Sequence, residues 1–217
     1  MAAIHRSALS VCQEALSQLR QDKVLLMEEL EGGTESAVGR KCRYAYEPSR
    51  MQIILAREWN FCRRRVAVLG VPRVPGVQRP AARVPDEAMR VVAAFGPCGR
   101  KLDGWSVYGN GEIRSSEPVA EIEYVVDAKD VDRWPPLVRD AFVKLLARNL
   151  AIPVTGRNAD LKVADDLYRE ALRQAALVDA RENKPGEEVW GDNVYADAIR
   201  GVAHGRHGGR HHGWRTR

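Results

Sequence analysis

The sequence lacks most of the features that mark common enzymes and membrane proteins. No window approaches about 18 consecutive apolar residues, so we expect no membrane-spanning helix. The N-terminal stretch is charged throughout and has no apolar segment of the kind found in secretory signals. The chain has no Ser-His-Asp arrangement, no H-E-x-x-H motif and no phosphate-binding glycine loop. We therefore expect no catalytic residue, no metal and no cofactor.

Cysteine is scarce, and its spacing fits neither a zinc site nor a disulfide framework. The four cysteines lie 20 to 36 residues apart and include no C-x-x-C pair. We predict reduced, mostly buried thiols in a cytosolic protein, at positions Cys12, Cys42, Cys62 and Cys98.

The basic character of the chain is concentrated at its C-terminal end. The formal net charge is +5, from 34 basic and 29 acidic residues. The closing stretch HGRHGGRHHGWRTR holds four arginines, without which the net charge is +1, and four of the five histidines. The body of the chain is therefore nearly neutral, and the positive charge belongs to an arm.

Helical periodicity dominates the two ends of the chain. Apolar residues recur at helical spacing over about residues 3–20, 35–59, 134–156 and 158–183. Because Pro48 removes a backbone hydrogen bond, we expect a kink or break there, with the helix restarting at this residue. Thr34 or Ser36 is expected to cap the second helix. Pro153 and Gly156 are expected to end the third.

The chain between the second and third helices carries the signals of strands. Five prolines and glycines between Gly70 and Pro80 exclude a helix in that stretch. The sequence Gly109-Asn110-Gly111, inside an alternating stretch, predicts a hairpin. Alternating apolar residues predict further strands near 66–68, 88–95 and 119–126.

These patterns predict an α+β fold. Helices from both chain halves, residues 1–62 and 134–184, form a bundle. A mostly antiparallel β-module, residues 63–133, is inserted between them. An extended C-terminal arm, residues 185–217, leaves the body.

Neighbouring carboxylates are the strongest hint of an enzyme, and they have simpler explanations. Asp165 and Asp166 are adjacent on a helix and point about 100° apart, so they do not form the converging pair of a glycosidase. Asp130 and Asp132, near Asp127, precede the third helix and are expected to cap it.

The run Arg63-Arg64-Arg65 invites a comparison with DNA-binding segments. On a strand the middle side chain points away from its neighbours, so the three cannot contact one row of phosphates together. Pairing with acidic residues of a neighbouring subunit and exposure to solvent are equally open. We expect weak contact with DNA at most.

Several motifs follow one another in an informative order. The stretch CRYAYEPSRMQIILAREWNFCRRRVAVL has a Tyr-Glu-Pro-x-Arg step and then a Trp-Asn-Phe triplet before a basic strand. The stretches WPPLVRDAFVKLLARNLAIPVTG and DLYREALRQAALVDAREN follow it. Over about residues 8–183 this order resembles tail tubular protein A, the head-to-tail adaptor family of short-tailed phages. The residues taken as its motif are Tyr46, Pro48, Arg50, Trp59, Asn60, Phe61, Trp134, Pro135, Gly156 and Tyr168.

The resemblance implies a structural role in a virion, with no enzymatic activity. Members form a ring of about twelve copies below the portal, which continues the DNA channel and meets the tail nozzle. The implied partners are further copies of the chain, the portal protein, the nozzle protein and genomic DNA in passage. The implied location is the head–tail junction, after assembly in the host cytoplasm.

The triplet Trp59-Asn60-Phe61 has two interpretations. Its aromatic side chains could anchor a subunit interface, where tryptophan is enriched. Alternatively they pack in the core, while Asn60 satisfies backbone groups at the turn. We favour the core, because large aromatic side chains are usually highly buried.

The arm also has competing interpretations. A docking peptide for the portal is favoured, with anchors and pairing groups at Trp190, Val194, Tyr195, Ile199, Arg206, Arg210, Trp214 and Arg215. The alternative function is nucleic-acid binding through the same arginines. A metal site is less favoured, because glycines deny a rigid frame to His204, His207, His211 and His212.

Overall fold

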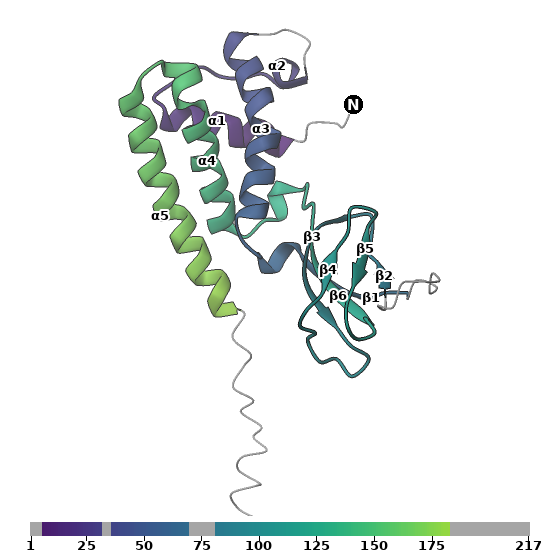
Figure 1. Cartoon of the computed structure of the whole chain (residues 1–217). Helices are drawn as coiled ribbons and strands as arrows, with labels where there is room; N and C mark the ends of the chain where they lie inside the picture. The colour runs from purple at the N-terminus through teal and green to yellow at the C-terminus, as the bar shows by residue number, and fades with distance from the viewer. Residues whose placement is uncertain (1–5, 32–35, 70–80, 183–217) are drawn as a thin grey trace, which may run out of the picture. The chain divides into compact units, whose positions relative to one another are not determined.

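The structure combines helices from both ends of the chain with two small sheets from its middle (Figure 1). This computed structural model describes residues 6–31, 36–69 and 81–182. The chain divides into two units, Met1–Glu182 and Asn183–Arg217, and every described residue belongs to the first. The predicted α+β class is confirmed.

The described elements follow one another in the predicted order. The helices are α1 (Arg6–Gln18), α2 (Met27–Glu31), α3 (Ala37–Ala56), α4 (Pro136–Thr155) and α5 (Asn158–Glu182). Two short 3-10 helices are η1 (Asn60–Cys62) and η2 (Val131–Arg133). The strands are β1 (Arg63–Ala67), β2 (Ala81–Arg83), β3 (Ala88–Phe95), β4 (Ser106–Val107), β5 (Glu112–Arg114) and β6 (Glu121–Val126).

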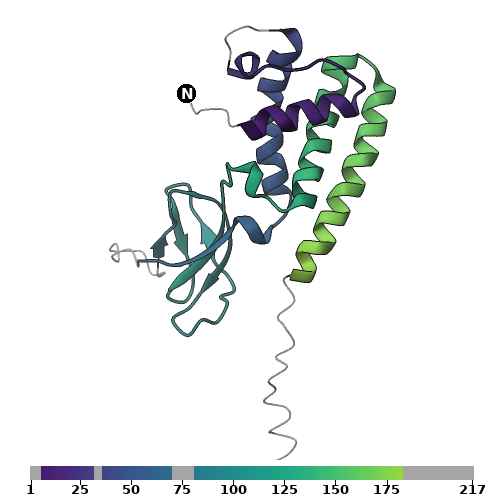
Figure 2. The ribbon, with the colours of Figure 1, turned by 180° about the vertical axis from the view of Figure 1, so that it is seen from behind.

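Helix α4 is the centre of the bundle. It packs against α1, α3 and α5, and Figures 1 and 2 show it between α3 and α5 from both sides. A helix that is apolar around most of its circumference is stable only when neighbours cover it. Its buried residues include Phe142, Leu145, Leu146 and Leu150.

Several predicted helix boundaries are confirmed. Ser36 caps α3, with its Oγ accepting a hydrogen bond from the Gly39 N–H at 3.0 Å. Gly156 ends α4 in the left-handed conformation, φ +69°, and its N–H donates to the Ile152 carbonyl at 2.9 Å. Pro153 does not end α4, which continues to Thr155. Thr34 lies outside the described residues.

The predicted break at Pro48 is wrong, because α3 runs without interruption through it. The proline itself is exposed, while Ile53 and Ile54 on the following turns are fully buried. Ser49 next to it is buried, donates to the Ala45 carbonyl at 2.7 Å and accepts from Asn149 of α4 at 2.8 Å. Packing of both ends of α3 outweighs the one backbone bond that proline removes.

Helix α2 was not predicted, and it depends on one buried carboxylate. Glu29 accepts a hydrogen bond from the Leu26 N–H at 3.0 Å and one from the Lys23 ammonium at 2.8 Å. The Glu29 N–H returns a bond to the Leu26 carbonyl at 3.1 Å, which makes a reciprocal cap. The Lys23 ammonium, the Ser36 hydroxyl and the Leu26 N–H lower the pKa of Glu29 from 4.5 to about 2.

Both sheets are antiparallel and have three strands, in the orders β1-β6-β3 and β2-β5-β4. The predicted hairpin is β4–β5, and its turn needs glycine at Gly111, where φ is +75°. Ile122 and Tyr124 of β6 face a small core between the sheets. Val125 of the same strand belongs to the helical core. Strand β6 therefore contributes to both cores.

The prediction of mostly buried thiols is confirmed. Cys12, Cys42 and Cys62 are buried and Cys98 is exposed. Burial raises the pKa of the Cys62 thiol to about 11. None of the helices in the described part of the chain is long and apolar enough to cross a membrane.

Gly39→Ala tests the close approach of α2 to α3. A Cβ at position 39 would lie 2.9 Å from the Glu29 Cβ and 3.1 Å from the Ser36 Oγ. We expect the free energy of unfolding to fall by about 1–3 kcal/mol, measured by urea denaturation. Gly109→Ala is the control, because its Cβ meets nothing within 4 Å. Equal effects of the two substitutions would contradict this packing.

Glu29→Gln tests the buried carboxylate through pH. Because the folded-state pKa of Glu29 is depressed, its contribution is complete above pH 4.5 and is lost as the pH falls toward 2. We expect the variant to be less stable at neutral pH and the gap to close in this acid range, measured by thermal unfolding. Glu28→Gln, at the exposed neighbour, should follow the wild-type pH curve.

Candidate functional site at the corner between helices and sheets

The chain turns from α3 into the first sheet through the predicted motif Trp59-Asn60-Phe61. The Trp59 side chain is fully buried, and its Nε1–H donates to the Ile53 carbonyl at 2.7 Å. Asn60 and Phe61 form η1, which leads directly into β1. For Trp59 the core interpretation is confirmed.

Asn60 joins this corner to the end of α5. Its backbone N–H donates to Asp179 Oδ1 at 2.9 Å, and its Nδ2 donates to the Asp179 carbonyl at 2.9 Å. Asp179 is only 5% exposed, and its second carboxylate oxygen lies 3.8 Å from Arg57 Nε. The prediction that Asn60 satisfies backbone groups at the turn is wrong, because its side-chain amide donates to the Asp179 carbonyl, on a helix 119 residues away.

A row of aromatic rings continues inward from the corner. Phe61 lies 5.3 Å from Trp134, Trp134 lies 5.4 Å from Phe142, and Phe142 lies 5.4 Å from Tyr46, between ring centroids. These tilted and edge-on contacts are favourable arrangements for aromatic pairs. The Trp134 Nε1–H donates to the Ala128 carbonyl at 3.0 Å. Motif residues from both halves of the chain therefore meet in one core.

Arg50 ties α3 to the segment after β6. Its guanidinium is 3% exposed, bonds the Asp127 carboxylate, and donates to Glu47 Oε2 at 2.9 Å through Nη2. A buried arginine of this kind needs such partners, because an unpaired buried charge is costly. Asp127, which the sequence grouped with possible catalytic carboxylates, is thus a partner of Arg50.

The remaining motif residues lie at the two ends of α4, on α5 and on α3. Pro135 is the cap position of α4 and Gly156 its C-terminal cap. Tyr168 of α5 is 9% exposed, with the Arg148 guanidinium 5.9 Å above its ring. Pro48 lies on the exposed face of α3.

The arginine run on β1 pairs within the chain. Arg63 bonds Glu123, and Arg65 Nε donates to Glu121 Oε2 at 2.6 Å, both on the neighbouring β6. The Arg65 guanidinium also lies 3.7 Å from the Phe95 ring centroid. Two of the three cations thus have acidic partners within the same sheet, which weakens the case for DNA contact.

The carboxylates singled out by the sequence do not converge. Asp165 pairs with Arg148 at 2.6 Å and with Arg169 at 2.7 Å, while Asp166 is exposed. Asp130 caps η2 rather than α4, accepting from the Asp132 N–H at 3.3 Å. The predicted cap is wrong because η2 intervenes between these residues and α4.

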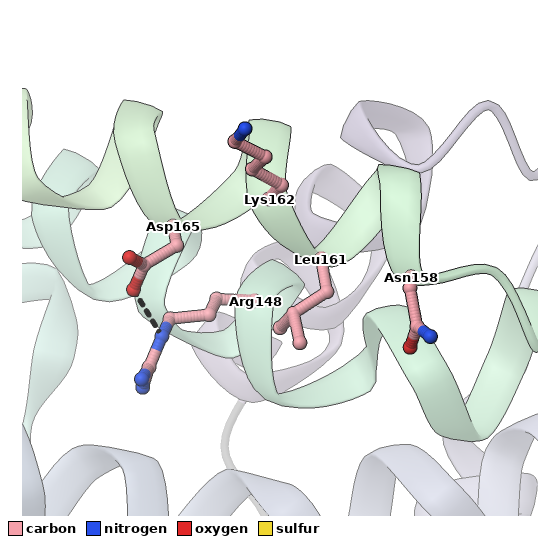
Figure 3. A pocket seen from close by; sticks show the side chains of 5 residues that line it. All are labelled: Arg148, Asn158, Leu161, Lys162 and Asp165. Carbon is pink, nitrogen blue, oxygen red and sulfur yellow. Dashed lines mark ion pairs between the residues drawn. The ribbon is translucent and has the colours of Figure 1, made fainter.

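A shallow hollow lies beside the Asp165–Arg148 pair, between α4 and α5 (Figure 3). It is lined by Arg148, Asn158, Leu161, Lys162 and Asp165. Arg148 and Asp165 form an ion pair along one side of the hollow, so these two opposite charges compensate each other. Within residues 6–31, 36–69 and 81–182, no three His, Cys, Asp or Glu side chains are grouped to hold a metal ion.

The predicted docking arm lies outside the described residues. This applies to Trp190, Val194, Tyr195, Ile199, Arg206, Arg210, Trp214 and Arg215, and to the histidines from His204 to His212. The stretch from Gly70 to Pro80 lies outside them as well.

Two buried acids were missed as structural residues. Neither Asp179 nor Glu29 was assigned a structural role from the sequence. Asp179 has a signal in the sequence, since it lies where the apolar helical period predicts a hydrophobic residue, whereas no helical period was predicted around Glu29. In α5 that period runs through Tyr168, Ala171 and Ala175 to Asp179. A charge on such a period indicates a buried partner.

Comparisons with known proteins add no family assignment. No protein-family model matches the chain, and no curated protein matches it either.

Asp179→Ala tests the link between the corner and α5. Loss of the carboxylate leaves the Asn60 N–H without its acceptor, so we expect the free energy of unfolding to fall by about 1–3 kcal/mol. Asp166→Ala makes the same change on the exposed face of α5 and should stay within about 0.5 kcal/mol of wild type. Chemical denaturation measures both. Equal stability of the two variants would contradict the role of Asp179.

Proposed function

We propose that this chain is a structural head-to-tail adaptor of a phage virion. In this role its copies form a ring between the portal and the tail nozzle and continue the DNA channel. The arm after residue 184 docks on the portal, and the protein acts at the head–tail junction after assembly in the host cytoplasm. It works by binding and has no catalytic step.

The observation that carries this proposal is the convergence of the motif residues. Trp59, Asn60 and Phe61 come from the first half of the chain, and Trp134 and Asp179 come from the second. The resemblance to tail tubular protein A rests in part on the first four of these positions. Their contacts supply a physical reason for their joint occurrence, because the helices and the sheets are joined there.

The charge distribution supports a channel wall that contacts DNA weakly. The arginines at 63 and 65 pair with Glu123 and Glu121, so their charge is largely compensated. Compensated charges of this kind attract phosphates less than unpaired arginines do. Sliding of DNA past the ring requires such weak contact.

Binding to a purified portal ring tests the proposal. The full chain should co-sediment with the portal protein encoded in the same genome, while a chain lacking residues 185–217 should not. The truncated chain should still unfold cooperatively, because the described core ends at Glu182. Substitution of Trp214 alone, against Thr216→Ala as control, localises the effect. Normal portal binding by the truncated chain would contradict the docking role of the arm.

Nucleic-acid binding is the second candidate, favoured by the arginines of the arm. Four arginines on duplex DNA predict a slope of about −3 to −4 for log K against log salt. An adaptor whose arm docks on protein should show no such slope with duplex DNA. Gel-shift titration over a range of salt concentrations separates the two functions.

A further inference from the structure

The turn of the β4–β5 hairpin holds the only asparagine of the sequence that is followed by glycine. Gly109, Asn110 and Gly111 form this turn, between Tyr108 and Glu112. The Tyr108 N–H donates to the Glu112 carbonyl at 2.8 Å, and the Gly111 N–H donates to the Tyr108 carbonyl at 3.0 Å. With Gly111 at φ +75°, the turn is a three-residue hairpin loop with a bulge at its last residue.

The Asn110 side chain is folded over the peptide bond that follows it. Its Oδ1 accepts a hydrogen bond from the Glu112 N–H, two residues further on, at 3.2 Å. Because this bond spans the Gly111 peptide, the side-chain carbon Cγ of Asn110 lies on the same side of the turn as the Gly111 nitrogen. Asn110 is exposed, and a Cβ added at Gly109 or at Gly111 would meet nothing within 4 Å. Water and hydroxide therefore reach this peptide from solvent.

We propose that Asn110 is a site of spontaneous deamidation in the folded protein, with water as the only co-reactant. The Gly111 nitrogen loses its proton to hydroxide and forms a bond to Asn110 Cγ. The bond from Cγ to Nδ2 breaks, and Nδ2 takes up a proton from water and leaves as ammonia. A cyclic succinimide then joins residues 110 and 111. This reactivity depends on the hairpin alone and is independent of the proposed function.

Hydrolysis of the succinimide gives two products. Attack of water at Cγ breaks the bond from Cγ to the Gly111 nitrogen and leaves an aspartate in an ordinary backbone. Attack at the main-chain carbonyl carbon breaks the original peptide bond and leaves isoaspartate, whose backbone runs through the side chain and is longer by one carbon atom. In both cases one amide and one water become one carboxylate and one ammonium ion.

The other asparagines in the described part of the chain lack this arrangement. Asn60 precedes a phenylalanine and Asn149 precedes a leucine. Their Nδ2 groups donate to the Asp179 carbonyl and to the Ser49 hydroxyl, which hold both side chains in place. Asn158 is the first residue of α5 and precedes an alanine. A side chain on the following residue obstructs the approach of its nitrogen to Cγ, whereas glycine has none.

Deamidation would change both the charge and the length of the hairpin. The Arg114 guanidinium and the Asn110 amide lower the pKa of Glu112. Either product replaces that amide with a carboxylate and brings like charges together. Isoaspartate also lengthens the turn close to Ile113, which is fully buried between the sheets and pairs with both neighbouring strands. The longer turn therefore disturbs the register of the second sheet.

Timed incubation of the folded full-length protein at mildly alkaline pH tests the inference. Peptide mapping by mass spectrometry should show conversion of amide to acid at Asn110 before any other asparagine. The conversion should be slower at mildly acidic pH, where hydroxide is scarce. Asn110→Gln should show no conversion at this position over the same period, because its longer side chain must close a larger ring. Asn158→Gln, at an exposed asparagine, is the matched control and should react at Asn110 as wild type does.

Three results would overturn the inference. The first is conversion at another asparagine ahead of Asn110. The second is conversion at Asn110 only after the chain has been unfolded in urea, because the folded turn would then protect the side chain. The third is an equal rate at the two pH values, which would exclude attack by the deprotonated Gly111 nitrogen.

Thermal unfolding of the separated products tests the structural consequence. The isoaspartate form should melt at a lower temperature than Asn110→Asp, which carries the same added charge in a backbone of ordinary length. The difference between the two isolates the effect of the extra backbone atom. Equal melting temperatures would contradict the effect on the second sheet.

Discussion

The burial of α4 is the constraint on which the rest of the bundle depends. A helix with apolar residues around most of its circumference must be enclosed, and α1, α3 and α5 enclose it. The same packing accompanies the continuity of α3 through Pro48, since Ile53 and Ile54 lie in the core that α4 shares. The chain segments that precede and follow the sheets in the sequence therefore pack into one helical core.

Side chains at the corner near Trp59 connect the helical bundle to the sheets. Asn60 contacts Asp179 and Phe61 contacts Trp134, so the point where α3 ends is held by α5 and by the start of α4. Val125 places β6 in the same helical core, while Ile122 and Tyr124 of that strand enter the core between the sheets. The sheets are therefore attached through side chains from several segments and not by a covalent linker alone.

Local chemistry made much of the fold predictable. Ser36 and Gly156 mark helix ends through caps that involve only residues nearby, and the β4–β5 turn depends on Gly111 alone. The features that the sequence did not predict involve residues that are distant along the chain. Ser49, next to Pro48, accepts a bond from Asn149, and Asp179 accepts one from Asn60, each partner about a hundred residues away. A single sequence does not reveal such partners, although a charge within an apolar period indicates that one exists.

The apolar face of α5 that the sequence predicts is wider than the face that the structure buries. Sequence periodicity in α5 includes Leu167 and Val178 with the core residues, yet both are more than a third exposed. The flank of α4 accommodates only the residues near Tyr168 and Ala175, so the apolar face is wider than the surface available to cover it. Isolated exposed apolar residues are ordinary on protein surfaces, so the exposure of Leu167 and Val178 reflects the limited width of the surface that α4 offers.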